Sequence, residues 1–287
     1  MAGARYQSCI RPAYRLLRRS PRLARASLLV GVFAFAPPAP QAPIPRDPAA
    51  LAQALSATST ELRAAIARWT PKNAAPPRDV VLYALYQHRT YRLLTGDENL
   101  ALKTLPLLAP RLRALSRDLL RAHHELYRLT PPLPAAAIKV GRAAPATALL
   151  ADYREAERRF RVPWDVLAAV NFVESKFGKL RSASAAGAQG PMQFVPATWR
   201  RYGLGGDVHD AHDAILGAAN YLHASGAPGH IRRALHAYNP SHAYVDAVLR
   251  YARTMRADRA MFYALYSWQV FVKTPSGDRR VTGPGLP

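Results

Sequence analysis

Residues 162–175 read VPWDVLAAVNFVES, an apolar run with a single carboxyl group near its end, Glu174. Proline fits the first turn of a helix, so Val162-Pro163 predicts a helix start. Trp164, Leu167, Ala168 and Phe172 then fall on one apolar side of that helix. A carboxyl group at the end of such a helix is costly to bury in its charged form, which raises its pKa and suits a general acid. The alternative for Glu174 is a residue of the last turn that points into water.

The same helical periodicity continues on the N-terminal side, over residues 49–145. Leu51, Leu55, Leu62, Ile66 and Trp69 share one face, and a second helix around 81–86 ends at Gly96. Leucines from Leu108 to Leu129 keep a spacing of three and four residues, with Pro110 in the first turn. This stretch predicts a helical hairpin or small bundle. It offers no recognisable chemistry, and we expect His123 and His124 at the surface.

The C-terminal side predicts further helices and one small hairpin. Helices are expected from Leu149, over Pro196–Tyr202, over Asp213–Ser225 with Asp213 as N-cap, and over Ser241–Arg256. Val270–Val272 and Arg279–Val281, joined by a Pro-Ser-Gly-Asp turn, predict a terminal hairpin. The fold class is therefore all-α with a small β-hairpin at the end.

The first 36 residues resemble a targeting segment. They contain seven arginines and no acidic residue, followed by the apolar run ASLLVGVFAFA at 26–36. A basic region, a short apolar region and a final Ala-x-Ala are the parts of a secretory signal. Eleven apolar residues fall short of the roughly 20 that a membrane span needs. We expect a signal peptide or N-terminal anchor over 1–36, the anchor being the alternative because Pro37 would follow the cleavage point.

Composition limits the other readings. The chain has 287 residues and a net charge of +22, of which 1–36, 37–150 and 151–287 contribute +7, +8 and +7. Such a charge favours an anionic partner without choosing among nucleic acid, acidic lipid and cell-wall polymer. The single cysteine, Cys9, excludes a disulfide framework and a cysteine-based zinc site. Six prolines in 37–48 predict an extended linker.

Two further motifs combine small, amide and aromatic residues. The loop at 182–194 reads SASAAGAQGPMQF, and Tyr238-Asn239-Pro240 separates two predicted helices. Small residues let a backbone approach a ligand closely, and amide and aromatic side chains match the hydroxyl groups and apolar face of a sugar. Together with Glu174, these motifs indicate a carbohydrate cleft.

Glu174-Ser175, the loop AGAQGPMQFVP at 186–196 and Ala237-Tyr238-Asn239 resemble, in order, the motifs of lytic transglycosylases with a lysozyme-like SLT domain. The resemblance covers about 150–256 and implies a lysozyme-like domain over 146–260, followed by a tail over 261–287. Two motifs resemble the membrane-bound type B branch more than the soluble one: GPMQF at 190–194, and Tyr238-Asn239-Pro240-Ser241 with Tyr244-Val245. The soluble branch has Leu where Pro191 stands, and the soluble branch stays open as the alternative.

The resemblance implies a role for each matching residue. Glu174 corresponds to the sole catalytic acid and base, and Ser175 to a support of the helix end. The residues implied to line the sugar cleft are Ser184, Gln193, Phe194, Tyr238 and Asn239, with Ser184 and Tyr238 near the acid. The implied reaction cleaves the MurNAc-β-1,4-GlcNAc bond of peptidoglycan and forms 1,6-anhydro-MurNAc, because no second carboxyl group lies in the motif region.

Three alternatives compete with this interpretation. Asp207 or Asp210 would assist an attacking water in a hydrolytic muramidase, and a degenerate cleft would leave only a peptidoglycan-binding protein. A zinc or calcium site is conceivable in the run Asp207, His209, Asp210, His212 and Asp213, but without a His-Glu-x-x-His spacing we expect no metal and no cofactor.

The expected partners follow from charge and export. The arginines at 250, 253, 256 and 259 drift around their helix, which predicts a solvated face. With an export signal present, we expect no nucleic acid as partner. The expected location is extracytoplasmic, at the cell wall or membrane, with peptidoglycan strands and anionic wall polymers as partners and membrane contact only through an uncleaved N-terminal segment.

Overall fold

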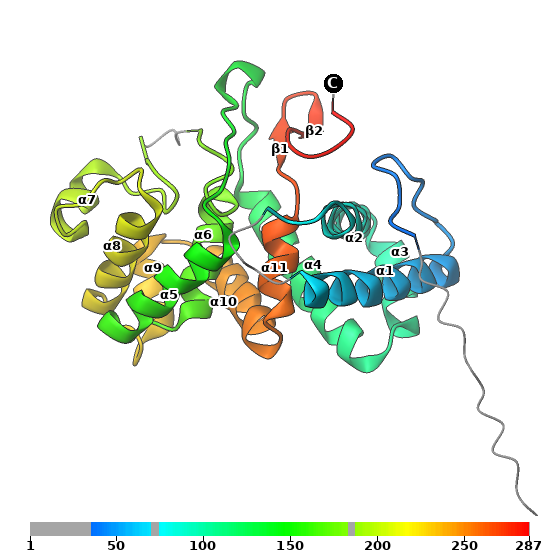
Figure 1. Ribbon diagram of the computed structural model, residues 1–287, viewed down its shortest axis with the longest axis horizontal. Helices are drawn as coiled ribbons and strands as arrows, with labels where there is room; N and C mark the ends of the chain where they lie inside the picture. Colours follow the sequence, from blue (N-terminus) through cyan, green and yellow to red (C-terminus); the bar gives the residue numbers. More distant parts are fainter. Residues whose placement is uncertain (1–35, 70–74, 183–186, 287) are drawn as a thin grey trace, which may run out of the picture. The chain divides into compact units, whose positions relative to one another are not determined.

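The computed structural model describes residues 36–69, 75–182 and 187–286, which belong to one compact unit, Phe35–Pro287 (Figure 1). This part of the chain contains eleven α-helices, two short 3₁₀ turns and one two-stranded sheet. The predicted all-α class with a C-terminal hairpin is confirmed. The leader, apart from Ala36, lies outside the described residues. Within them, no helix combines the length and apolar character that crossing a membrane requires.

Four helices build the N-terminal stretch: α1 (Pro48–Arg68), α2 (Arg78–Gly96), α3 (Glu98–Thr104) and α4 (Pro110–Leu129). Two of them start at an aspartate cap. The Asp47 carboxylate accepts the Ala50 N–H at 2.8 Å, and the Asp97 carboxylate accepts the Leu100 N–H at 2.9 Å. Such caps satisfy amide donors that a helix start leaves free.

Seven helices follow: α5 (Ala146–Phe160), α6 (Trp164–Ser175), α7 (Pro196–Tyr202), α8 (Ala211–Ala224), α9 (Ile231–Tyr238), α10 (His242–Ala257) and α11 (Ala260–Ser267). The expected cap of α8 is wrong. Asp210 is the cap, and its carboxylate accepts the backbone N–H of Asp213 in the first turn. The hairpin pairs β1 (Phe271–Thr274) with β2 (Gly277–Arg280), Thr274 opposite Gly277.

Helix α6 is packed on every side. It contacts α5, α8, α10 and α11, and ten of its twelve residues are buried. A helix that is apolar all round belongs in a protein interior, in agreement with the run that opens the sequence. The one acidic residue of its first turn, Asp165, has a side chain only 2% exposed and pairs with Arg256 at 2.9 Å. Burial raises the pKa of Asp165, and the Arg256 guanidinium opposes that effect.

One hydrophobic core joins the N-terminal helices to the later ones. Helix α11 contacts α1, α2, α6 and α10, and Figure 1 shows α10 and α11 between the two groups of helices. Trp268, just after α11, donates its indole N–H to Gln87 of α2 at 3.2 Å. Trp69 meets Tyr263 edge to face, with ring centroids 5.4 Å apart. The 49–145 stretch therefore packs directly on the helices that follow it.

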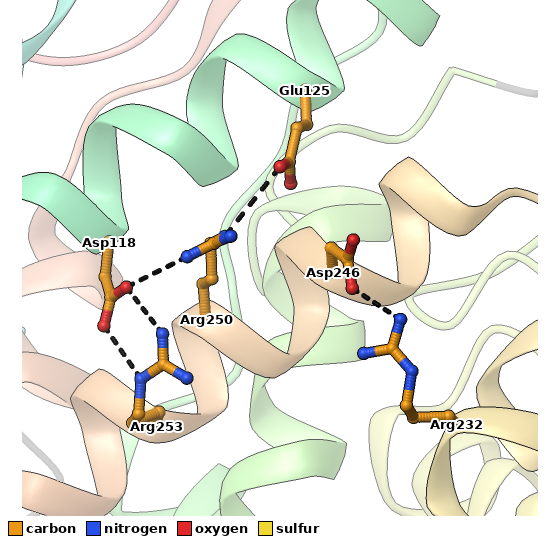
Figure 2. Close-up of polar contacts among 6 residues, drawn as sticks. All are labelled: Asp118, Glu125, Arg232, Asp246, Arg250 and Arg253. Carbon is orange, nitrogen blue, oxygen red and sulfur yellow. Dashed lines mark hydrogen bonds and ion pairs between the residues drawn. The ribbon is translucent and has the colours of Figure 1, made fainter.

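Arg253, Arg256 and Arg259 are exposed, as the predicted solvated face requires, whereas Arg250 is half-buried. The arginines of α10 also pair with carboxylates of other helices. Arg253 binds Asp118 of α4 through two hydrogen bonds, at 2.9 and 2.6 Å, and Arg250 reaches the same carboxylate at 3.2 Å (Figure 2). Arg250 also lies 3.8 Å from Glu125. The prediction did not include these ion pairs because it considers α10 alone, whereas α4 packs along this face and supplies Asp118 and Glu125.

His123 also differs from its expected surface position. Its ring lies within 3.3 Å of the Arg92 guanidinium and 3.2 Å of the Thr95 hydroxyl, and burial lowers its pKa to about 3. His124, the next residue, is exposed as expected. The α4 face that carries His123 turns inward because α2 packs against α4.

Replacing Asp118 tests the contact between α4 and α10. Asp118→Ala leaves two arginines without their shared carboxylate, so we expect the free energy of unfolding to fall by about 2 kcal/mol in urea denaturation followed by circular dichroism. Asp246, which pairs with Arg232 at 2.6 Å and is 39% exposed, is the matched control (Figure 2). Asp246→Ala is expected to cost less than about 1 kcal/mol. Equal losses for the two variants would contradict the assigned role of Asp118.

Candidate active site

The candidate site begins where α6 ends, in a tight turn of left-handed backbone. Lys176, Phe177 and Gly178 have φ values of 54°, 62° and 81°. This backbone conformation is unfavourable for residues other than glycine. Two contacts stabilise it. Phe177 is 1% exposed and packs on Phe172 and Phe262, and the Lys176 ammonium donates to the carbonyls of Phe172 and Val173 at 3.1 and 3.3 Å.

Ser175 and Asn171 tie this turn to the small-residue loop. The Ser175 hydroxyl donates to the Pro191 carbonyl at 2.5 Å and accepts the Gly178 N–H at 2.8 Å. The Asn171 amide donates to the same carbonyl at 2.9 Å, and its oxygen accepts the Tyr153 hydroxyl at 2.8 Å. Ser175 is fully buried, so it supports the helix end, as expected.

The loop forms a tight hairpin turn beside α6. Gln189 and Phe194 exchange two backbone hydrogen bonds of 2.9 Å, and the chain reverses between them. Gly190, with φ of 74°, stands at the start of the reversal. A Cβ atom there would lie 1.9 Å from the Val208 carbonyl oxygen, so the close approach of that backbone requires glycine.

Glu174 is half-buried beside this turn, and within the described residues its carboxylate accepts one hydrogen bond. The Tyr244 hydroxyl, on α10, donates to its carboxylate at 2.6 Å, and Tyr244 is itself 3% exposed. Burial raises the pKa of Glu174 to about 7, and the Tyr244 hydrogen bond and the Lys176 charge oppose that rise. The carboxyl group is therefore poised near neutrality, where it can both give and take a proton.

Tyr238, which the family resemblance places near the acid, makes its hydrogen bond to a group other than Glu174. Its hydroxyl donates to the Met192 carbonyl at 2.6 Å, while Glu174 is close enough to raise its pKa further, after burial. Phe194 is 3% exposed and packs edge to face on Trp199 and Tyr238, with centroids 5.1 and 5.9 Å away. Phe194 thus lies in the core beneath Tyr238.

The other residues predicted to line the sugar cleft, Gln193, Asn239 and Ser184, differ in their positions. Gln193, with φ of 52°, donates its side-chain amide to the Gly190 carbonyl at 3.0 Å and lines a cavity of about 450 Å³ beside the loop. Glu174 does not line that cavity. Asn239 is half-buried at the junction of α9 and α10. Ser184 lies outside the described residues.

Tyr244 belongs to a motif of the family resemblance, but its hydrogen bond to Glu174 was not predicted. It lies three residues after Ser241, whose hydroxyl caps α10 by accepting the Tyr244 N–H at 3.3 Å. The sequence does carry a signal that Tyr244 has a hydrogen-bond partner. Tyr244 falls on the buried face of its helix with Val245 and Val248, and a buried tyrosine hydroxyl needs such a partner. The sequence does not say that this partner is Glu174.

The aspartate and histidine run before α8 forms a local hydrogen-bonded cluster. Asp210, His212 and Asp213 each offer one side-chain atom that could bind a metal ion, and these atoms lie within 4.8 Å of one another. The Asp213 carboxylate accepts the Asp207 N–H at 2.9 Å, and the His212 ring lies within 3.3 Å of Glu155. These contacts order the loop and the start of α8.

Comparison with known protein families bears on the segment that holds this geometry. Residues 152–260 match the Transglycosylase SLT domain. Comparisons with curated proteins and with solved structures gave no match. The match begins within α5, ends at the start of α11 and includes Glu174, the hairpin loop and Tyr244.

The SLT domain supports the lytic transglycosylase interpretation for this segment, with a lysozyme-like fold and peptidoglycan as the substrate. It supports an enzyme at the level of the family. The helices α1 to α4 precede the SLT domain, and Asp118 of α4 binds Arg253 within it.

Replacing Glu174 with glutamine tests whether burial raises the pKa of its carboxyl group in the folded chain. A pKa of about 7 in the folded chain, against 4.5 unfolded, means that the folded state retains a proton that the unfolded state releases as pH rises. The wild type should therefore lose stability between pH 4.5 and pH 7, relative to Glu174→Gln, by up to about 3 kcal/mol. Urea denaturation across this range measures the difference. A difference that stays constant with pH would contradict the raised pKa.

Proposed function

We propose that the chain is a peptidoglycan lytic transglycosylase that cleaves the MurNAc-β-1,4-GlcNAc bond and forms 1,6-anhydro-MurNAc. The observation that carries the proposal is the environment of Glu174, a half-buried carboxyl group with a pKa raised to about 7 and a 2.6 Å hydrogen bond from Tyr244. Such a group suits a reaction in which one residue is first an acid and then a base.

Glu174 acts twice in the proposed reaction. In its neutral form it donates a proton to the glycosidic oxygen, the bond to the MurNAc anomeric carbon breaks, and the GlcNAc end leaves as an alcohol. The N-acetyl group of MurNAc stabilises the positive charge on the ring. The Glu174 carboxylate then takes the proton of the 6-hydroxyl of the same sugar while that oxygen bonds to the anomeric carbon. The carboxyl group is regenerated and no water is consumed.

The contacts of the nearby aspartates favour this course over hydrolysis. Two-carboxyl glycosidases need a second group to activate water or attack the sugar. Asp207, Asp210 and Asp213 instead accept backbone N–H groups of their own loop and helix start. No other carboxylate appears among the groups that shift the pKa of Glu174 in the described residues. A hydrolytic muramidase remains the alternative enzyme, and a non-catalytic peptidoglycan-binding protein the alternative without chemistry.

The glycan is proposed to run past Gln193, Tyr238 and Asn239, with Ser184 on the adjacent loop. Phe194 contributes by supporting the Tyr238 ring from the core. The GPMQF sequence at 190–194 favours the membrane-bound type B branch. The leader over 1–36 supports export to the cell wall or membrane, and the net charge of +22 suits anionic wall polymers.

Product analysis of a Glu174 variant tests the reaction. Glu174→Gln cannot donate the proton, so release of 1,6-anhydro muropeptides from purified wall should fall by at least about 100-fold, measured by mass spectrometry. Asp207→Asn and Asp210→Asn are the controls and should keep the anhydro product. Muropeptides ending only in reducing MurNAc would assign the hydrolytic alternative. Unchanged lysis by Glu174→Gln would exclude Glu174 as the acid.

Replacing Tyr244 tests the hydrogen bond to the acid. This bond stabilises the ionised carboxylate, so Tyr244→Phe should raise the pKa of Glu174 and keep it protonated at higher pH. The alkaline fall in kcat/KM should then move upward by about one pH unit. Tyr238→Phe is the control because its hydroxyl binds the Met192 carbonyl, and its alkaline fall should stay in place. A downward movement in Tyr244→Phe would contradict the assigned bond.

A further inference from the structure

A second cavity, of about 590 Å³, lies among α1, α4, α10 and α11 and is not lined by any of the predicted site residues. Its volume is typical of small-molecule sites. Both the N-terminal helices and the end of the SLT domain contribute to it. The walls are mostly apolar and include Leu62, Ile66, Leu112, Leu115, Met261 and Ala264.

Three of the four hydroxyl groups that line this cavity donate to the protein's own backbone, and the fourth, that of Ser59, accepts a hydrogen bond from Gln87. Ser56, Thr60 and Thr254 donate to carbonyls of their own helices, at 2.7, 3.0 and 2.8 Å. Gln87, which is 2% exposed, uses its amide on Ser59 and its oxygen on Trp268. A bound peptide would bury backbone groups that need partners, and these lining groups offer it few donors. The cavity therefore fits a hydrocarbon chain better than a peptide.

Three arginines and two aspartates complete the lining. The Arg63 and Arg111 side chains are 51% and 77% exposed and share one carboxylate, Asp258. Arg111 lies 4.0 Å from that carboxylate, beyond hydrogen-bond distance. Arg253 is committed to Asp118. Of the three arginines, Arg63 and Arg253 are hydrogen-bonded to the two aspartates, whereas Arg111 is not. Arg111 can therefore bind an anion without breaking a hydrogen bond to either aspartate.

We propose that this cavity binds a single-chain amphiphile with an anionic head group, a fatty-acid-like molecule. The acyl chain lies against the apolar walls, and the head group binds Arg111, with Arg63 beside it. The ligand would contact α4 and α10 at once, beside the Asp118–Arg253 pair (Figure 2). This site is independent of the glycan reaction.

Calorimetric titration of the full chain with dodecanoate, below its micelle concentration, tests the proposal. We expect saturable binding of one molecule. Affinity should fall by up to about fourfold for each methylene group removed from the chain. Dodecanol, which lacks the charge, should bind at least about tenfold more weakly.

Variants at the lining locate the ligand. Ala114 and Ala257 are exposed and line the cavity, so Ala114→Trp and Ala257→Trp should block it without disturbing the core. Arg111→Gln should weaken dodecanoate binding at least about tenfold. Arg117→Gln is the matched control, because Arg117 is exposed on the same helix and does not line the cavity.

Three results would overturn the proposal. The first is absence of saturable dodecanoate binding, and the second is wild-type affinity in both tryptophan variants, each shown to be folded by thermal unfolding. The third is equal affinity for dodecanol and dodecanoate, which would show that the anionic head group does not contribute to binding. Self-association in sedimentation velocity that Ala114→Trp abolishes, without dodecanoate binding, would assign the cavity to a second copy of the chain.

Discussion

The burial of α6 on every side is the constraint on which the rest of the structure depends. Ten of its twelve residues are inside the protein, yet Glu174 near its end is only half-buried. The chain resolves this conflict with left-handed backbone at Lys176 and Phe177, where the burial of the Phe177 ring compensates for the unfavourable conformation. The surroundings that fix the helix also keep water from Glu174, and this desolvation raises its pKa.

The helices before the SLT domain support the same centre from outside it. The chain between α4 and α5 pairs with the chain after α6, where Lys139 and Arg181 are linked by a backbone hydrogen bond of 2.8 Å. The Ser182 hydroxyl adds hydrogen bonds to the backbone of Ala137 and Lys139. On the other side, Asp118 of α4 holds the arginines of α10, the helix that carries Tyr244. The segment between α4 and α5 therefore braces the chain that follows α6, and α4 braces the helix that carries Tyr244.

Local patterns predicted most helices because each needs only its own periodicity and its end signals. Pro196 and Tyr202 bound α7 as expected, and Ser241 caps α10. The cap of α8 was misplaced because Asp210 and Asp213 are equally good caps in a sequence, and only the backbone shows which one receives an N–H. The ion pairs of the α10 arginines could not be predicted from their spacing, because Asp118, the carboxylate that Arg250 and Arg253 share, lies 132 residues before Arg250 in the chain.

Glu174 was predicted as the acid from a carboxyl group near the end of an apolar helix, and the motif order after it indicated the SLT domain. Both signals are local. The working environment of Glu174 is not local. The hydroxyl group that donates to the Glu174 carboxylate belongs to Tyr244, 70 residues later in the chain. The Tyr238 hydroxyl donates to the Met192 carbonyl instead. The amphiphile cavity likewise exists only where helices from both ends of the chain pack together. Hydrogen bonds and desolvation depend on distances in space, and packing sets those distances between segments that the sequence keeps far apart.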